Sequence, residues 1–281
     1  MGAGRERGHR STARGRHVGL GAALALAVGL FAVPASARTG PNGVAPQCVR
    51  PLVAVYDLGS SAAEWADWAG PCAVAVEYGA GPVTRVLGFA VRVGGVASIE
   101  ESAAEIEAEI AAILDRTGAD VVDVVARGSG ALVVHHALTR PVRGAPPPVR
   151  TLVSLGPFWA GTEVLGLAAV ADLNRRIGIY DALAAVERPL VAPFCVSCGQ
   201  VVARSTFLRS VSAATAAGVR YVDIVSATDG IAAPAAGAAP RGRQVVVVQD
   251  VDPTSTVDHG GLAGDAVVRR LAIDVTRNGD R

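Results

Sequence analysis

One junction in the sequence has the residue spacing of a site for nucleophilic chemistry. The β-branched run 121–125 predicts a strand, and a helical pattern resumes at 132–138 after a cluster of small residues. A strand-to-helix elbow that presents a catalytic serine needs small residues two before and two after the nucleophile. Ala126, Gly128 and Gly130 have this spacing, so the residue at the nucleophile position is Gly128.

Ser129 is the alternative nucleophile. If Ser129 were the elbow residue, Arg127 would lie two residues before it, and a long guanidinium side chain at that crowded position would push the helix from the strand. The register with Gly128 at the elbow therefore fits better. A Gly-Ser-Gly triplet is also compatible with a plain flexible turn, and Ser129 remains open as a displaced nucleophile.

The elements around this junction predict a layered α/β protein. Strands and helices alternate, which favours a doubly wound, mostly parallel sheet with helices on both faces. Residues 165–193 mix helical periodicity with Gly and Pro and are expected to form a cap-like insertion. The further expected strands are 51–56, 73–78, 149–155, 221–225 and 244–249, and the further helices are 98–117 and 262–275.

The first 37 residues have the pattern of a secretory signal peptide. An arginine-rich start precedes the apolar run 18–33, and Ala35-x-Ala37 fits a signal-peptidase site. We expect cleavage after Ala37, one domain over 38–281, and a protein that is secreted or held in the cell envelope without a stable membrane span.

Composition and cysteine usage limit the possible partners. Beyond the leader, 21 basic residues face 24 acidic ones, which gives no indication of nucleic-acid binding. Four cysteines in an exported chain predict disulfides, with three possible pairings. Cys48 with Cys72 and Cys195 with Cys198 are favoured, because the first two lie beside early strands and the last two are neighbours. No second Cys-x-x-Cys or suitable His pair accompanies Cys195, so neither a metal nor a cofactor is expected.

Several segments carry a family resemblance. The matching segments are Pro71-Cys72-Ala73-Val74 with Glu77-Tyr78-Gly79, Ile99-Glu100-Glu101-Ser102-Ala103, Cys195-x-x-Cys198 with Ser205-x-Phe207-Leu208, Tyr221-x-x-Ile224 with Thr228-Asp229, and Gln249-Asp250-Val251 with Asp258-His259-x-Gly261-Leu262. From about residue 51 to 275 the chain resembles secreted triacylglycerol lipases of the actinobacterial type, within the α/β-hydrolase superfamily. The resemblance implies an α/β-hydrolase fold, an apolar cleft for a lipid or acyl ester, and Asp229 and His259 as the acid and base of a Ser–Asp–His order.

The departures from this family pattern fall on its chemistry. Gly128 stands where the family has the nucleophilic serine, and Tyr56-Asp57 stands where a His-Gly motif helps to form the oxyanion hole. Tyr56, Asp57 and Ser129 are thus expected in the oxyanion region, where a carboxylate would repel the developing charge.

Two functional hypotheses follow. The first is an exported, catalytically impaired lipase relative that binds an acyl chain or an unidentified protein partner. The alternative is an active esterase in which Ser129 acts with His259 and Asp229.

Overall fold

The computed structural model describes residues 48–68, 70–80, 84–86, 89–91, 93–162, 195–211, 214–232 and 240–277. The expected signal peptide and the expected cap-like insertion at 165–193 lie outside these residues. The elements are β1 (Leu52–Val55), η1 (Ala62–Trp68), β2 (Ala73–Val76), β3 (Thr84–Val86), β4 (Phe89–Val91), α1 (Ile99–Thr117), β5 (Val122–Arg127), α2 (Ser129–Thr139), β6 (Val149–Leu155), α5 (Val196–Val201), α6 (Thr206–Ser210), β7 (Arg220–Val225), β8 (Gln244–Val247), α7 (Val248–Val251) and α8 (Ala266–Arg277).

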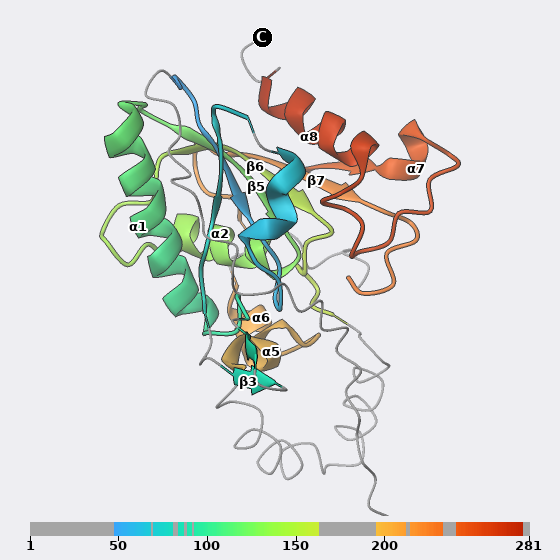
Figure 1. Cartoon of the computed structure of the whole chain (residues 1–281), viewed down its shortest axis with the longest axis horizontal. Helices are drawn as coiled ribbons and strands as arrows, with labels where there is room; N and C mark the ends of the chain where they lie inside the picture. Colours follow the sequence, from blue (N-terminus) through green and yellow to red (C-terminus); the bar gives the residue numbers. More distant parts are fainter. Residues whose placement is uncertain are drawn as a thin grey trace, which may run out of the picture. The chain divides into compact units, whose positions relative to one another are not determined.

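A six-stranded sheet is the centre of the fold (Figure 1). Its strand order is β2-β1-β5-β6-β7-β8, and every neighbouring pair is parallel. All six residues of β5 are buried, as expected for a strand covered on both faces. The chain runs from β1 outward to β2 and then returns to β5 on the other side of β1. The order of strands therefore reverses between β1 and β5, which is where open α/β sheets place their ligand sites.

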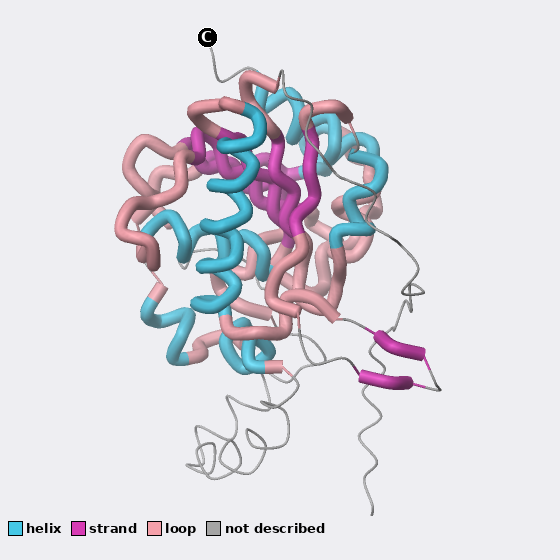
Figure 2. Tube along the Cα trace, turned by 60° about the vertical axis from the view of Figure 1, so that its left-hand side comes forward, coloured by secondary structure: helices cyan, strands magenta, loops and turns pink. Residues whose placement is uncertain are grey.

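Helices cover both faces of this sheet (Figure 2). On one face α1 packs against α2. On the other, η1 is joined to the region of α8, because Trp68 Nε1 donates to the Ala263 carbonyl at 2.6 Å and Arg269 donates to the Asp67 carbonyl at 3.1 Å. The fold class predicted from the sequence is confirmed. The small antiparallel pair β3–β4 was not predicted.

Helix α1 shows how the sequence specifies one of these layers. Its N-cap Ser98 accepts a hydrogen bond from the Glu101 backbone N–H, and the Glu101 side chain returns one to the cap. One face of α1 carries an apolar stripe that is buried, except that Leu114 is only partly buried. The members of the stripe that are fully buried are Ile99, Ala103, Ile106, Ile110 and Ile113.

Two helix starts differ from the sequence prediction. Helix α2 begins at Ser129 rather than 132, because the small residues after Gly128 are already helical. Helix α8 begins at Ala266 rather than 262, because the Asp265 carboxylate accepts the backbone N–H groups of Val267 and Val268 and caps the helix there.

Two disulfides are present in the structure. Cys48 is bonded to Cys72, which ties the start of β1 to the start of β2, and Cys195 is bonded to Cys198 at the start of α5. These are the two pairings that the sequence favours.

Candidate active site

The turn from β5 into α2 has an unusual backbone conformation at Gly128. Its φ is 50° and its ψ is −117°, a region that L side chains rarely adopt. Two residues later, a Cβ on Gly130 would lie 2.4 Å from the Tyr56 carbonyl oxygen, so this position has no room for a side chain. The strained residue of the elbow is therefore Gly128, and Ser129 is the first residue of the helix.

The space above Gly128 is filled by the carboxylate of Asp57. A Cβ added to Gly128 would lie 2.3 Å from Cγ, Oδ1 and Oδ2 of Asp57, far inside van der Waals contact. Asp57 follows β1 and Gly128 follows β5, so the two residues meet at the reversal of strand order. The carboxylate consequently occupies the place that a nucleophile's side chain would take at residue 128.

One oxygen of Asp57 is held by two backbone donors. Oδ1 accepts the N–H of Ser129 at 2.7 Å and the N–H of Leu58 at 2.7 Å. The Ser129 amide follows the elbow residue and the Leu58 amide follows the end of β1, and a pair of amides at these two positions forms the oxyanion hole of this kind of elbow. The Oδ1 atom lies where such a hole would hold a negatively charged oxygen.

The other oxygen of Asp57 faces the imidazole of His259. Oδ2 lies 2.9 Å from His259 Nε2, and His259 Nδ1 lies 2.7 Å from Asp229 Oδ2. The Asp229 Oδ1 atom accepts the backbone N–H groups of Ile231 and Ala232, each at 2.9 Å, which fixes that carboxylate. His259 is thus held between two carboxylates, and its ring stacks on Phe158 with centroids 5.0 Å apart.

Burial and charge act in opposite directions on these groups. Burial by itself would lower the pKa of His259, but its bonds to Asp229 and Asp57 prevail and raise the pKa to about 9. Burial would raise the pKa of Asp57, but His259 and Arg127 together lower it. The pKa of Asp229 is lowered in the same way, with His259 outweighing the effect of burial. At neutral pH the arrangement is therefore an imidazolium between two carboxylates.

Arg127 and Glu64 complete the group of buried charges. Arg127 donates to both carboxylate oxygens of Glu64, at 2.5 and 2.6 Å, and lies 3.5 Å from Asp57 Oδ2 and 3.3 Å from the His259 carbonyl oxygen. Its side chain is 10% exposed. Its direction toward η1 explains how a long side chain is accommodated immediately before the elbow.

The environment of Ser129 does not favour the displaced-nucleophile hypothesis. Ser129 is 1% exposed, and its hydroxyl oxygen accepts the Leu58 N–H at 2.8 Å. Both ring nitrogens of His259 are meanwhile engaged by carboxylates. Where the alternative hypothesis requires a contact between Ser129 and the base, His259 Nε2 instead lies 2.9 Å from Asp57 Oδ2.

The expectation for Tyr56 is also corrected. Its hydroxyl donates to the Tyr78 carbonyl at 2.5 Å and accepts the Tyr78 N–H at 2.8 Å, and the two rings stack at 4.5 Å. The side chain of Tyr56 lies in the core and does not line the oxyanion region, because successive side chains of an extended segment point to opposite faces.

Three participants in the site, Leu58, Glu64 and Phe158, were not predicted from the sequence. The Leu58 N–H could have been found from the rule that the loop after the first strand supplies one donor of the hole. Nothing local in the sequence pairs Glu64 with Arg127, which are 63 residues apart, or places Phe158 on the ring of His259.

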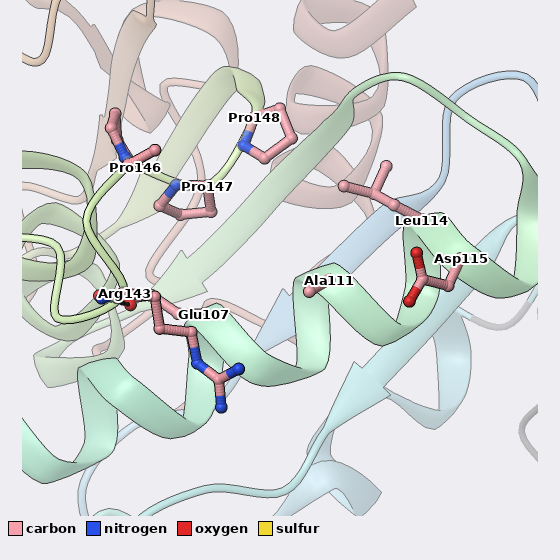
Figure 3. A pocket seen from close by; sticks show the side chains of 9 residues that line it. Glu107, Ala111, Leu114, Asp115, Arg143, Pro146, Pro147 and Pro148 are labelled. Atoms are coloured by element: carbon pink, nitrogen blue, oxygen red, sulfur yellow. Dashed lines mark hydrogen bonds between the residues drawn. The ribbon is translucent and has the colours of Figure 1, made fainter.

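A hollow is lined by a separate set of residues (Figure 3). It has a volume of about 320 Å³ and lies between α1 and the proline-rich loop that precedes β6. The Glu107 carboxylate holds this loop by accepting the N–H groups of Val142 and Arg143. The residues that line it are Glu107, Ala111, Leu114, Asp115, Arg143, Ala145, Pro146, Pro147 and Pro148, and this set does not include Asp57 or His259.

Two absences hold for the residues that the structure describes. Among them, no group of three or more His, Cys, Asp or Glu side chains is arranged to hold a metal ion. No helix among them is both long enough and apolar enough to cross a membrane.

Comparisons with known proteins show the fold. No protein-family model matches the chain, and no curated protein matches its sequence. Among solved structures, an esterase from Pyrobaculum calidifontis has a TM-score of 0.50 at 16% identity, covering 82% of this chain and 77% of that one. Together with the parallel sheet and its helices, this likeness shows that the chain has the α/β-hydrolase fold.

Two other solved structures are more distant in shape. The RedJ thioesterase from the prodiginine biosynthetic pathway of Streptomyces coelicolor has a TM-score of 0.46 at 18% identity, covering 88% of this chain and 91% of that one. The mature Bacillus licheniformis lipase BlEst2 has a TM-score of 0.47 at 14% identity, covering 82% and 91%.

Proposed function

We propose that this protein is an exported relative of the α/β-hydrolase-fold lipases that has lost serine-dependent ester hydrolysis. The observation that carries this proposal is the position of the Asp57 carboxylate, which fills the side-chain space of Gly128. Loss of a serine nucleophile costs on the order of 10⁶-fold in rate in a well-studied serine protease. The same carboxylate also takes both donors of the oxyanion hole, so a second part of the serine mechanism is lost with the first.

The activity that we propose was lost is the hydrolysis of esters. The order Asp229 then His259, each after a strand of the sheet, and their 2.7 Å contact support descent from an ester hydrolase. The role compatible with this loss of hydrolysis is binding of an acyl chain or a protein partner without turnover. Export is supported by the leader-like first 37 residues and by the two disulfides.

Ester turnover and active-serine labelling test the proposal. We expect the purified protein to hydrolyse short- and long-chain acyl esters no faster than a His259→Ala variant, and a serine-directed phosphonate probe to leave Ser129 unlabelled. The matched control is Ser129→Ala, which should behave like the parent. A hydrolysis rate that depends on His259 and disappears in Ser129→Ala would overturn the proposal and restore the displaced-nucleophile hypothesis.

A further inference from the structure

The two disulfides differ in the length of the loop that each closes and in their exposure. Cys48 and Cys72 are 24 residues apart, Cys48 is buried, and their bond ties the start of β1 to the start of β2. Cys195 and Cys198 are three residues apart, and both are partly exposed. A disulfide that closes so short a loop removes little entropy from the unfolded chain, and partial exposure gives an attacking thiolate access to its sulfur atoms. The Cys195–Cys198 bond is therefore the one that a reductant breaks first.

This disulfide holds the first turn of a very short helix. Helix α5, labelled in Figure 1, has only six residues, Val196–Val201, and a helix of this length is not stable in water by itself. The disulfide and the hydrogen bond from the Cys198 backbone N–H to Cys195 Sγ, at 3.2 Å, both stabilise its first turn. Breaking the disulfide consequently weakens the turn that contains Val196 and Ser197.

The first turn of α5 holds the segment of residues 94–97. The backbone N–H groups of Val196 and Ser197 both donate to the Val96 carbonyl, at 2.8 and 3.3 Å. The Ser197 hydroxyl donates to the Gly95 carbonyl at 2.6 Å. Because Ser197 is 2% exposed, loss of this hydrogen bond would leave a buried donor and a buried acceptor unpaired. The position of the 94–97 segment therefore depends on the first turn of α5.

The 94–97 segment in turn holds the loop that follows β1. The Gly94 carbonyl accepts the Gly59 N–H at 3.0 Å. Gly95 packs so closely on the same loop that a Cβ added to it would lie 3.1 Å from Leu58 Cα. Leu58 supplies one of the two amides that bind the carboxylate next to His259. A continuous series of contacts thus joins the Cys195–Cys198 disulfide to the candidate site.

We propose that the Cys195–Cys198 disulfide is a redox-sensitive clasp for the loop of residues 57–60. While the disulfide is intact, the clasp keeps Asp57 and the Leu58 amide in the arrangement that binds His259. Reduction of the disulfide loosens α5, then the 94–97 segment and then this loop. The inference goes beyond the proposed loss of ester hydrolysis and does not depend on it.

The chemical step is thiol–disulfide exchange with a dithiol reductant. A thiolate of the reductant attacks one sulfur of the Cys195–Cys198 bond, that bond breaks, and the other cysteine leaves as a thiolate. The second thiolate of the reductant then attacks the reductant's own sulfur in the mixed disulfide and releases the second cysteine. The two cysteines take up the two protons of the dithiol. The protein thereby gains two electrons and two protons, and the dithiol becomes a cyclic disulfide.

The first measurement asks which disulfide is reduced first. The full mature protein is treated with increasing concentrations of dithiothreitol, free thiols are alkylated with iodoacetamide, and the cysteine peptides are identified by mass spectrometry. We expect Cys195 and Cys198 to be alkylated at about a tenth of the dithiothreitol concentration that Cys48 and Cys72 require.

The second measurement is amide hydrogen exchange at the concentration that reduces only the Cys195–Cys198 bond. We expect the amides of residues 57–60 and 94–97 to exchange at least about tenfold faster than in the oxidised protein, because local opening of both segments becomes easier. Reoxidation should restore the slow exchange. Helix α8 lies outside this series of contacts, so its amides should exchange at the same rate in both forms.

Three variants test the series of contacts. The double variant Cys195→Ser with Cys198→Ser should show the fast exchange without any reductant. Ser197→Ala keeps the disulfide and removes the hydroxyl that bonds Gly95, so the 94–97 segment should exchange faster in the oxidised protein, and reduction should add less than it does in the parent. The matched control is Ser210→Ala, which removes a hydroxyl that donates to a carbonyl within α6 and should change neither segment.

Three results would overturn the inference: reduction of both disulfides at the same dithiothreitol concentration, unchanged exchange of both segments after selective reduction, or an equal acceleration in α8, which would indicate a general loss of stability. The measurements on the parent protein decide the question even if the double serine variant does not fold. Ester turnover and phosphonate labelling are independent of these results and bear only on the loss of the serine mechanism.

Discussion

The two halves of the candidate site depart from the lipase pattern to different degrees. The half that follows β7 and β8 keeps the residue types and geometry of a hydrolytic acid–base pair, with Asp229 2.7 Å from His259. The half that follows β1 and β5 differs at both of its groups from what the lipase resemblance implies, because Asp57 stands where it implies glycine and Gly128 where it implies serine. In the first half, His259 contacts the carboxylate of Asp57 at the position where the base of a serine triad contacts a hydroxyl.

The changed half shows that its two exchanges depend on each other. A side chain at residue 128 and the present position of the Asp57 carboxylate cannot coexist, because their atoms would lie 2.3 Å apart. With glycine at 128, by contrast, the carboxylate finds two amide donors and an imidazolium. The Asp57 carboxylate thus fills the space that glycine leaves open at residue 128.

The largest expected effect comes from reversing both exchanges together. Gly128→Ser alone should remain inactive toward esters, because its side chain collides with Asp57, and Asp57→Gly alone has no nucleophile. The double variant places a hydroxyl beside His259 and frees the Leu58 and Ser129 amides, so we expect at least about 10²-fold faster ester hydrolysis than in either single variant. Initial rates on a short-chain ester measure this.

The control for this cycle is Asp57→Gly with Gly128→Ala, which fills the elbow without adding an oxygen. Circular dichroism establishes that each variant is folded. If the folded serine variant hydrolyses the ester no faster than the alanine control, then Asp229 and His259 do not activate a hydroxyl at residue 128. The view that one half of the site is preserved would then be wrong.

The second prediction concerns the imidazolium that joins the two halves. His259→Ala leaves the Asp57 and Asp229 carboxylates facing each other without the cation between them, in a region where both side chains are at most 7% exposed. Removing one partner from a buried ion pair typically costs 3–5 kcal/mol, so we expect the free energy of unfolding to fall by about that amount. Urea unfolding measures it.

A second histidine serves as the control for that prediction. His136 is a half-buried imidazole on α2 that burial keeps toward its neutral form, with a lowered pKa. His136→Ala should cost about 1 kcal/mol, the usual effect of a substitution that breaks no charged pair. Equal losses in the two variants would contradict the view that His259 links the halves through charge.

The sequence predicted the sheet, α1 and the elbow register because these features rest on local periodicity and on short-range steric rules. The small size of Ala126, Gly128 and Gly130 is a property of the residues themselves and does not depend on the rest of the chain. The approach of Asp229 to His259 followed from the resemblance to a family, not from spacing. The orientation of Asp57 could not be predicted, because it depends on how the ends of β1 and β5 meet.

Long-range charge pairing was the other feature that the sequence could not supply. Arg127 fits immediately before the elbow because its guanidinium turns away to pair with Glu64. Steric rules applied to neighbouring residues cannot predict this pairing. The start of α8 was misplaced for a simpler reason, since the capping role of Asp265 depends on its side chain turning back to the helix.

The smallest expected effect is the dependence of stability on pH. It distinguishes the imidazole of His259 from the carboxylates of Asp57 and Asp229, because the two kinds of group lose their contributions in opposite directions of pH. The pKa of His259 is raised to about 9 in the folded protein, against an ordinary value near 6.5. Its contribution is therefore fully present below about pH 6.5 and is lost as the pH rises toward 9, by on the order of 3 kcal/mol if it acts alone. The pKa values of Asp57 and Asp229 are lowered, so their contribution is present above about pH 4 and is lost as the pH falls below it.

Stability should consequently be greatest between about pH 4 and 6.5, and urea unfolding across the pH range measures this profile. Asp57→Asn keeps the shape of the side chain and removes one of the two carboxylates that hold the proton on His259, so its alkaline loss should still begin near pH 6.5 but end at a lower pH and be smaller. His136→Ala should leave the alkaline limb unchanged. If Asp57→Asn loses stability over the same alkaline range as the parent, the proton on His259 is held by Asp229 alone, and the preserved half of the site does not depend on the changed one.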